Sequence, residues 1–362
     1  MNKYLLLLPL LFWSVQFIHA QESKEAFDHA LIGQALDAIY NFEFEQAEVR
    51  IRELKARRPQ HPVASLLSAQ CLYWKHFPMT LSKEAFRPYQ AHLQQTLRGA
   101  QALMGNDQTR AEGIFFALTV HGYQSLLESE AGHNVAAMRE ARKAFGYLKE
   151  AFQLKDHYPD LYLATGLYNF YVEQYPEDHP VVKPIMWFFS DGNKKMGLQQ
   201  LEMAARQGTF IRTEALYHLV CIYQKYGLDP VKAPDFSWQL VGRHPRNLLF
   251  VTRHAELLIA GGRYGEAQPF VDGLSRSQNV VFLTAAHCLQ GIIQEKQHRN
   301  LTEAKTHYQQ VGRLSPDKRR DAEQNAALLY TRGFHAMAHA GLERIARQEA
   351  PAKPGAPATK NR

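Results

Sequence analysis

The sequence predicts an all-α protein built from consecutive helical hairpins. After residue 24 almost no alternating strand pattern occurs, and apolar residues recur every three or four positions, which is the period of an amphipathic helix. Short polar segments separate these stretches. The 362 residues are enough for two ordinary domains or for one extended solenoid. A hydrophobic content of 46% is typical of a chain that buries a core.

The N-terminus has the pattern of a cleavable secretory signal. Lys3 supplies a positive charge, an apolar run extends from Leu5 to Trp13, and the small residue Ala20 precedes Gln21. The apolar run is too short for a stable membrane span, and no later run of sufficient length follows. We therefore expect export to a bacterial periplasm or secretion, with cleavage of residues 1–20 near Ala20. An uncleaved N-terminal anchor is the alternative.

Charge and cysteine content exclude several classes of protein. The formal net charge is +7, and part of that excess lies in the signal and in the C-terminal tail, so the folded body is only weakly basic. This balance does not indicate a nucleic-acid partner. Cys71, Cys221 and Cys288 are too few and too widely spaced for a disulfide framework, and we expect them on helices, where free cysteine is commonly buried.

A repeated pattern marks the second helix of each hairpin. A small residue is followed four positions later by a bulky one and three positions after that by an apolar one, often with a proline five residues beyond. The small residue lets two helices approach closely, and the proline cannot continue a helix and so starts the next unit. The copy at Ala233 is weak because Ser237 replaces the bulky residue. The copies begin at Ala47, Ala144, Gly197, Ala233, Ala267 and Ala304.

These positions resemble the tetratricopeptide repeat family over most of residues 21–348, in a degenerate form. First-helix positions are poorly kept, and several pairs exceed the usual unit of about 34 residues. The resemblance implies a right-handed superhelical solenoid whose first helices line a concave groove for a protein or peptide partner. The residues that it places on this groove are Tyr171, His218, Lys225, Thr252, Glu256 and Lys296.

The central hairpin departs from the repeat. An aromatic helix at 160–172 precedes a proline-broken insert at 174–193, and a second helix follows at 194–208. Its small residues Gly166 and Gly197 lie 31 positions apart, where the pattern expects about 12. We expect Ser190 or Asp191 to cap the second helix.

The aromatic residues of this hairpin have two interpretations. Tyr168 and Tyr171 are either tyrosines at the rim of the core or partner-binding anchors on the groove. Trp187 and Phe188 lie in a segment too apolar to remain in water. The insert therefore either plugs the groove, docks a partner, or contacts a membrane.

The remaining elements follow the same helical period. A long pair at 109–127 and 134–154 surrounds an acidic turn at 128–133, and a final helix covers 320–347. The solenoid is expected to end at residue 348. Residues 349–362 are rich in proline and alanine, which predicts a flexible basic tail.

No catalytic motif or phosphate-binding loop occurs in the sequence. His335 and His339 lie one helical turn apart without an evident third metal ligand, and paired carboxylates such as Glu128 and Glu130 are expected to be solvated in turns. We therefore predict a non-catalytic scaffold that binds a protein or peptide in the cell envelope, without cofactor, metal or nucleic acid. The alternative is a small-molecule or glycan binder, or an enzyme, with a pocket covered by residues 174–193. The partner and the oligomeric state remain open.

Overall fold

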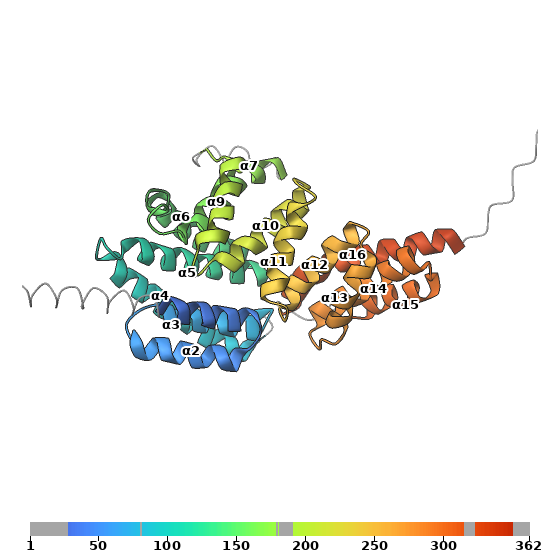
Figure 1. The fold of residues 1–362 in the computed structure, drawn as a ribbon, viewed down its shortest axis with the longest axis horizontal. Coiled ribbons are helices and arrows are strands. Elements are labelled where there is room, and N and C mark those ends of the chain that lie inside the picture. The colour runs from blue at the N-terminus through green and yellow to red at the C-terminus, as the bar shows by residue number, and fades with distance from the viewer. Residues whose placement is uncertain (1–27, 80–81, 179, 181–190, 315–322, 350–362) are drawn as a thin grey trace, which may run out of the picture. The chain divides into compact units, whose positions relative to one another are not determined.

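The computed structural model describes residues 28–79, 82–178, 180, 191–314 and 323–349. Within these segments every regular element is a helix, so the all-α prediction is confirmed. The chain divides into two compact units, the first ending at Phe250 and the second beginning at Val251, and each is described by itself (Figure 1). No helix in the described part of the chain is long and apolar enough to cross a membrane.

Unit 1 is a series of helices in which neighbours along the chain pack together. The most extensive contacts are those of α5 with α6, α7 with α9, and α4 with α5 (Figure 1). The elements are a helix at residues 28–40, α2 (Phe44–Arg57), α3 (Val63–Lys75), α4 (Lys83–Met104), α5 (Arg110–Glu130), α6 (Asn134–Leu154), α7 (Leu161–Asp178), α9 (Lys194–Gln207), α10 (Arg212–Tyr226), α11 (Lys232–Arg243) and the start of α12 (Leu248–Ala260).

Unit 2 continues the series with the rest of α12, α13 (Tyr264–Ser275), α14 (Val280–Ile293), a π-helical turn η3 (Gln294–His298), α15 (Leu301–Arg313) and α16 (Glu323–Glu349). The carboxylate of Glu295 in η3 accepts hydrogen bonds from the Tyr308 hydroxyl at 2.7 Å and from Arg344 at 2.8 and 2.9 Å. This buried carboxylate therefore joins the end of α14 to both α15 and α16.

The small residues of the repeat pattern lie where helices approach most closely. Ala304 and Tyr308 of the best-kept copy are buried. The Tyr308 ring fills the space opposite Gly291 and Gly341, because a Cβ on either glycine would lie within 2.6 Å of a ring atom. In α9, a Cβ on Gly197 would lie 2.7 Å from the backbone nitrogen of Phe170. The close helix packing predicted from these small residues is confirmed.

The helix that precedes the insert is longer than expected. We predicted an insert from residue 174, but α7 continues to Asp178 with Pro176 inside its last turn. Gln174 donates to the Asp178 carboxylate at 2.9 Å, and Lys225 and Tyr226 of α10 donate to the same carboxylate at 2.8 and 2.7 Å. These tertiary contacts hold the final turn in spite of the proline.

The start of α9 also differs from the expectation. Asn193, not Ser190 or Asp191, caps the helix, and its Oδ1 accepts a hydrogen bond from Met196 N at 2.8 Å. Glu173 accepts from Lys194 N at 2.8 Å, so a carboxylate of α7 occupies the positive end of the helix dipole. The Glu173 carboxylate therefore lies where the helix dipole and the lysines of this first turn attract a negative charge.

The close approach of α7 and α9 gives a test of the repeat interpretation. In Gly197→Ala, the new methyl group would lie 2.8 Å from Gly166 O and 2.7 Å from Phe170 N, both backbone atoms. We expect the free energy of unfolding to fall by about 1–3 kcal/mol, as for other overpacked sites, measured by urea denaturation.

Gly122→Ala is the matched control, since a Cβ at this helical position meets no atom within 4 Å. We expect it to raise the free energy of unfolding by about 0.5–1 kcal/mol. Equal effects of the two substitutions would contradict close packing at Gly197.

Candidate functional site

The first helices of the hairpins in unit 1 meet through polar side chains. Glu214 at the start of α10 accepts hydrogen bonds from the Tyr40 hydroxyl, from Gln70 Nε2 at 3.2 Å and from the Tyr123 hydroxyl at 3.4 Å. Gln70 Nε2 also lies 2.8 Å from the Tyr123 hydroxyl. These residues come from the helix at 28–40, α3, α5 and α10, so a polar cluster links four helices that are distant in sequence.

The Glu214 carboxyl group lies in an unfavourable place for a charge. Its Oε2 atom is buried and accepts no hydrogen bond from the described residues. Burial raises the pKa of Glu214 to about 7, and the nearby Asp160 carboxylate acts in the same direction. Burial likewise raises the pKa of the Tyr40 and Tyr123 hydroxyls. The hydrogen bonds from Tyr40 and Tyr123 act against this rise, but all three hydroxyl and amide donors are neutral and none supplies a positive charge.

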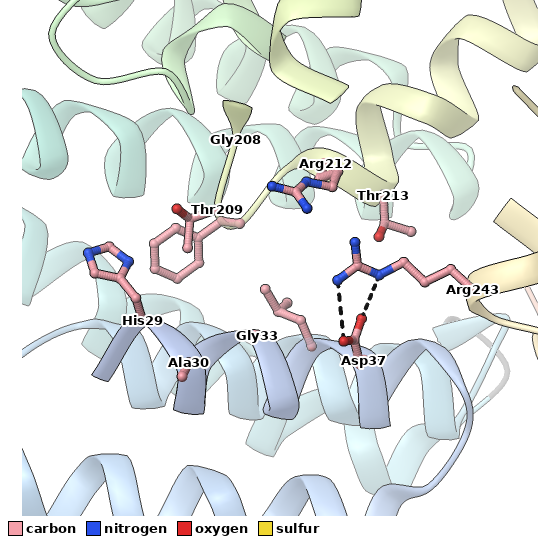
Figure 2. Close-up of a pocket in the computed structure, with 11 residues that line it drawn as sticks. His29, Ala30, Gly33, Asp37, Gly208, Thr209, Arg212, Thr213 and Arg243 are labelled. Carbon is pink, nitrogen blue, oxygen red and sulfur yellow. Dashed lines mark hydrogen bonds and ion pairs between the residues drawn. The ribbon is translucent and has the colours of Figure 1, made fainter. Parts of the chain in front are cut away.

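A second group of contacts fastens the helix at 28–40 to the end of α11. Arg243 binds the Asp37 carboxylate at 2.9 and 3.3 Å (Figure 2). Asn41 Nδ2 donates to Arg243 O at 3.2 Å and lies 3.3 Å from His244 Nδ1. The other ring nitrogen of His244 lies 3.1 Å from the Thr213 hydroxyl. Burial lowers the pKa of His244 to about 4, so this ring is neutral at physiological pH.

A pocket of about 440 Å³ lies beside these contacts (Figure 2). We call it the Arg212 pocket. One wall is the helix at 28–40, and the other is the turn before α10 together with Arg243. Its lining residues are His29, Ala30, Gly33, Leu36, Asp37, Gly208, Thr209, Phe210, Arg212, Thr213 and Arg243.

The turn that carries Arg212 is fixed by a buried carboxylate. Asp160 Oδ1 accepts hydrogen bonds from Phe210 N at 2.8 Å and from Ile211 N at 3.2 Å. Burial raises the pKa of Asp160 to about 6, and these amide donors act against that rise. The first backbone donors before α10 are therefore already used by the protein.

The outer face of α6 is a second exposed feature. The side chains of Val135 and Met138 are 70% and 68% exposed. Arg139, Arg142 and Lys149 lie on the same stripe of the helix, and none forms an ion pair with a carboxylate of the described residues. We call these five residues the α6 outer face. It combines exposed apolar surface with uncompensated positive charge.

The tyrosines predicted on the central hairpin make contacts inside the protein. The Tyr168 ring lies 5.8 Å from the Phe145 ring and 5.7 Å from the Phe152 ring, both on α6. This supports its interpretation as a core residue. Tyr171 packs edge-on against Phe170 at 5.2 Å and is partly exposed, and burial raises its pKa to about 12.

The other predicted groove residues are distributed over both units. His218 and Lys225 lie on α10, and burial lowers the pKa of His218 to about 4. In unit 2, Thr252 is buried, Glu256 accepts a hydrogen bond from Arg253 at 2.8 Å, and Lys296 lies 2.9 Å from Glu295. Their role in partner binding stays a prediction. Trp187 and Phe188, with the pocket expected beneath them, lie outside the described residues.

One expectation about carboxylates is wrong. Glu130 is only 1% exposed, because α5 continues to this residue and places it beside Tyr73, whose hydroxyl donates to it at 3.1 Å. Of the two histidines considered for metal, His339 Nδ1 lies 3.5 Å from Glu343. In the described part of the chain no group of three or more His, Cys, Asp or Glu side chains is arranged to hold a metal ion.

Comparison with known proteins finds matches among solved structures alone. No family model matches the sequence, and no curated protein matches it. Among solved structures, a tetratricopeptide repeat protein from Parabacteroides merdae is similar over 86% of this chain and 98% of its own, with 13% identity and a TM-score of 0.36.

The neutral surroundings of Glu214 predict a pH dependence of stability. The pKa in the folded state, about 7, lies above the ordinary value of 4.5, so the unfolded chain loses its proton first as the pH rises. The stability of unit 1 should therefore fall between about pH 4.5 and 7, by about 3 kcal/mol from this group. We expect Glu214→Gln, which keeps an acceptor without the charge, to remove this part of the decline and to raise the melting temperature at pH 8.

Glu150→Gln serves as the control, because Glu150 forms an exposed ion pair with Arg110. Thermal melts of the unsubstituted protein and both variants at pH 5 and pH 8 would show whether Glu214 causes the fall in stability. If Glu214→Gln leaves the difference between the two melting temperatures unchanged, Glu214 does not hold its proton in the folded protein.

Proposed function

We propose that the chain is an exported, non-catalytic helical-repeat scaffold, and that the α6 outer face binds an acidic segment of a partner protein. The observation that carries this proposal is the pairing of two strongly exposed apolar side chains with three unpaired cations on one helical stripe. Export rests on the signal pattern at residues 1–20, and the absence of a recognisable catalytic motif favours a binding role.

Both components of this face have a physical reason to bind. Burial of apolar area contributes about 25 cal/mol per Å², so covering Val135 and Met138 favours association. The cations add complementarity toward carboxylates, which mainly speeds association and excludes basic partners. In contrast, the nearby Lys143 and Glu140 are already paired at 2.7 Å, and Glu140 also lies 2.9 Å from His121. The free charge of α6 is therefore concentrated on the α6 outer face.

The groove predicted from the family resemblance is the competing surface. Several of its expected residues already have partners within the chain, among them Lys225 with Asp178 and Glu256 with Arg253. In unit 1, first helices also contact one another through Tyr40 and Glu214. A partner that bound Lys225 or Glu256 would have to replace their ion pairs, whereas the α6 outer face requires no such exchange.

Site-specific photo-crosslinking tests the proposal. With a crosslinking amino acid at Met138, cells should yield a discrete adduct whose mapped partner peptide is acidic. Arg139→Glu with Arg142→Glu should weaken binding of the purified partner at least about tenfold, which corresponds to about 1.4 kcal/mol. Binding to the unsubstituted scaffold should also weaken as salt is raised, because exposed charges are screened.

A matched surface lies on α2. Val49 is 48% exposed, and Arg52 and Lys55 are exposed cations of the same helix. Crosslinking at Val49, or Arg52→Glu with Lys55→Glu, should give neither the adduct nor the loss of binding. If both surfaces behave alike, or if charge reversal on α6 changes nothing, the proposed role of the α6 outer face is wrong.

A further inference from the structure

We infer that the Arg212 pocket binds a small organic anion, with the Arg212 guanidinium receiving its carboxylate or phosphate group. This site is separate from the α6 outer face and goes beyond the proposed scaffold function. Neither motif nor repeat pattern indicates it, since its walls come from residues 29–37 and 208–213 together with Arg243.

The charge in the pocket is unevenly compensated. Arg243 forms two hydrogen bonds with Asp37, which neutralises this pair (Figure 2). Arg212 forms no ion pair with any described carboxylate. Its Nε is buried without a hydrogen-bond partner among these residues, and only one Nη makes a contact, 3.4 Å from Arg206 O. A planar guanidinium with unused donors matches the paired oxygens of a carboxylate or phosphate.

The rest of the pocket suits the body of a small molecule. Its volume of about 440 Å³ lies in the range of ordinary ligand sites. Ala30, Leu36 and Phe210 provide apolar lining, and His29 and Thr209 add polar side chains to it (Figure 2). This composition favours a compact organic acid or sugar phosphate over an extended apolar ligand.

Gly33 keeps one wall of the pocket open. A Cβ at this position would meet no atom within 4 Å, although Gly33 lies in the middle of a helix. Glycine weakens a helix relative to alanine, by about 0.5–1 kcal/mol. No packing contact here requires glycine, and the space that it leaves belongs to the pocket.

The walls are held in place before any ligand arrives. Asp160 fixes the turn before Arg212 through the amides of Phe210 and Ile211. The opposite wall is joined to α10 by the Tyr40–Glu214 hydrogen bond. A preformed site loses less entropy on binding. Because Asp160 already uses the amides of Phe210 and Ile211, these two groups are not available to the anion, and Arg212 supplies the charge that binds it.

Two substitutions test the site in different ways. Gly33→Met fills the pocket without removing any hydrogen bond, and it replaces a poor helix former with a good one. Arg212→Gln removes the charge but keeps a polar side chain. The controls are Gly122→Met, at a helical glycine that is equally free of contacts, and Arg206→Gln, at an exposed arginine in the last turn of α9.

The probes are succinate, glucose 6-phosphate and inorganic phosphate, measured by calorimetry with the mature chain. We expect the unsubstituted protein and both controls to bind at least one organic probe with a Kd below about 1 mM. Gly33→Met and Arg212→Gln should each weaken that binding at least about tenfold, while Gly33→Met melts at the same temperature or higher. Preference for succinate or for glucose 6-phosphate identifies the carboxylate or phosphate source.

Several results would overturn the inference. These are no saturable binding of either organic probe, binding of inorganic phosphate alone, or binding that survives both Gly33→Met and Arg212→Gln. Loss of binding in Gly122→Met would show an effect on folding and not on the pocket. Charge reversal at Arg139 and Arg142 should leave anion binding intact. Failure of the proposed role of the α6 outer face is therefore distinguishable from failure of the proposed anion site.

Discussion

The hydrogen bond from Tyr40 to Glu214 is the contact on which unit 1 depends, because it joins side chains 174 residues apart in sequence. The Tyr40 ring lies among other rings, 5.7 Å from Trp74, 5.2 Å from His244 and 6.1 Å from Phe250. A carboxyl group beside such an aromatic cluster must be hydrogen-bonded or protonated, since an isolated charge there is costly. The cluster therefore fixes both the position of Tyr40 and the protonation of its partner.

The hydrogen bond between Tyr40 and Glu214 also sets the separation of the two walls of the Arg212 pocket. Arg212 and Thr213 immediately precede Glu214 on α10, and Asp37 lies one turn before Tyr40 on the opposite helix. The distance between the two walls is thus set where Tyr40 meets Glu214. The Asp37–Arg243 pair spans the same gap, but both side chains are at least 40% exposed, and exposed pairs contribute only about 0–1 kcal/mol. The buried contact dominates.

Sequence periodicity was sufficient to predict the helical hairpins but not the polar cluster around Glu214. The small residues Ala304 and Gly197 could be predicted because the residues of a helix's buried face lie only three or four positions apart in sequence. Glu214 resembles an ordinary first-turn acid, a residue type favoured by the helix dipole. Nothing near it in sequence indicates that Tyr40 and Tyr123 converge on it. Likewise Pro176 signals the end of a helix, and only the long-range contacts of Asp178 explain why α7 continues.

The charge of the hydrogen-bond donors determines whether the buried carboxyl group of each unit is ionised. Burial disfavours ionisation of both Glu295 and Glu214, yet Arg344, Lys296 and Tyr308 lower the pKa of Glu295 to about 2. The donors around Glu214 are neutral, and its pKa is raised to about 7. Glu295 therefore stays charged through the physiological range, where Glu214 exchanges its proton. The contacts around Glu295 in unit 2 therefore keep their charge as the pH changes, whereas the contact between Tyr40 and Glu214 in unit 1 is sensitive to pH.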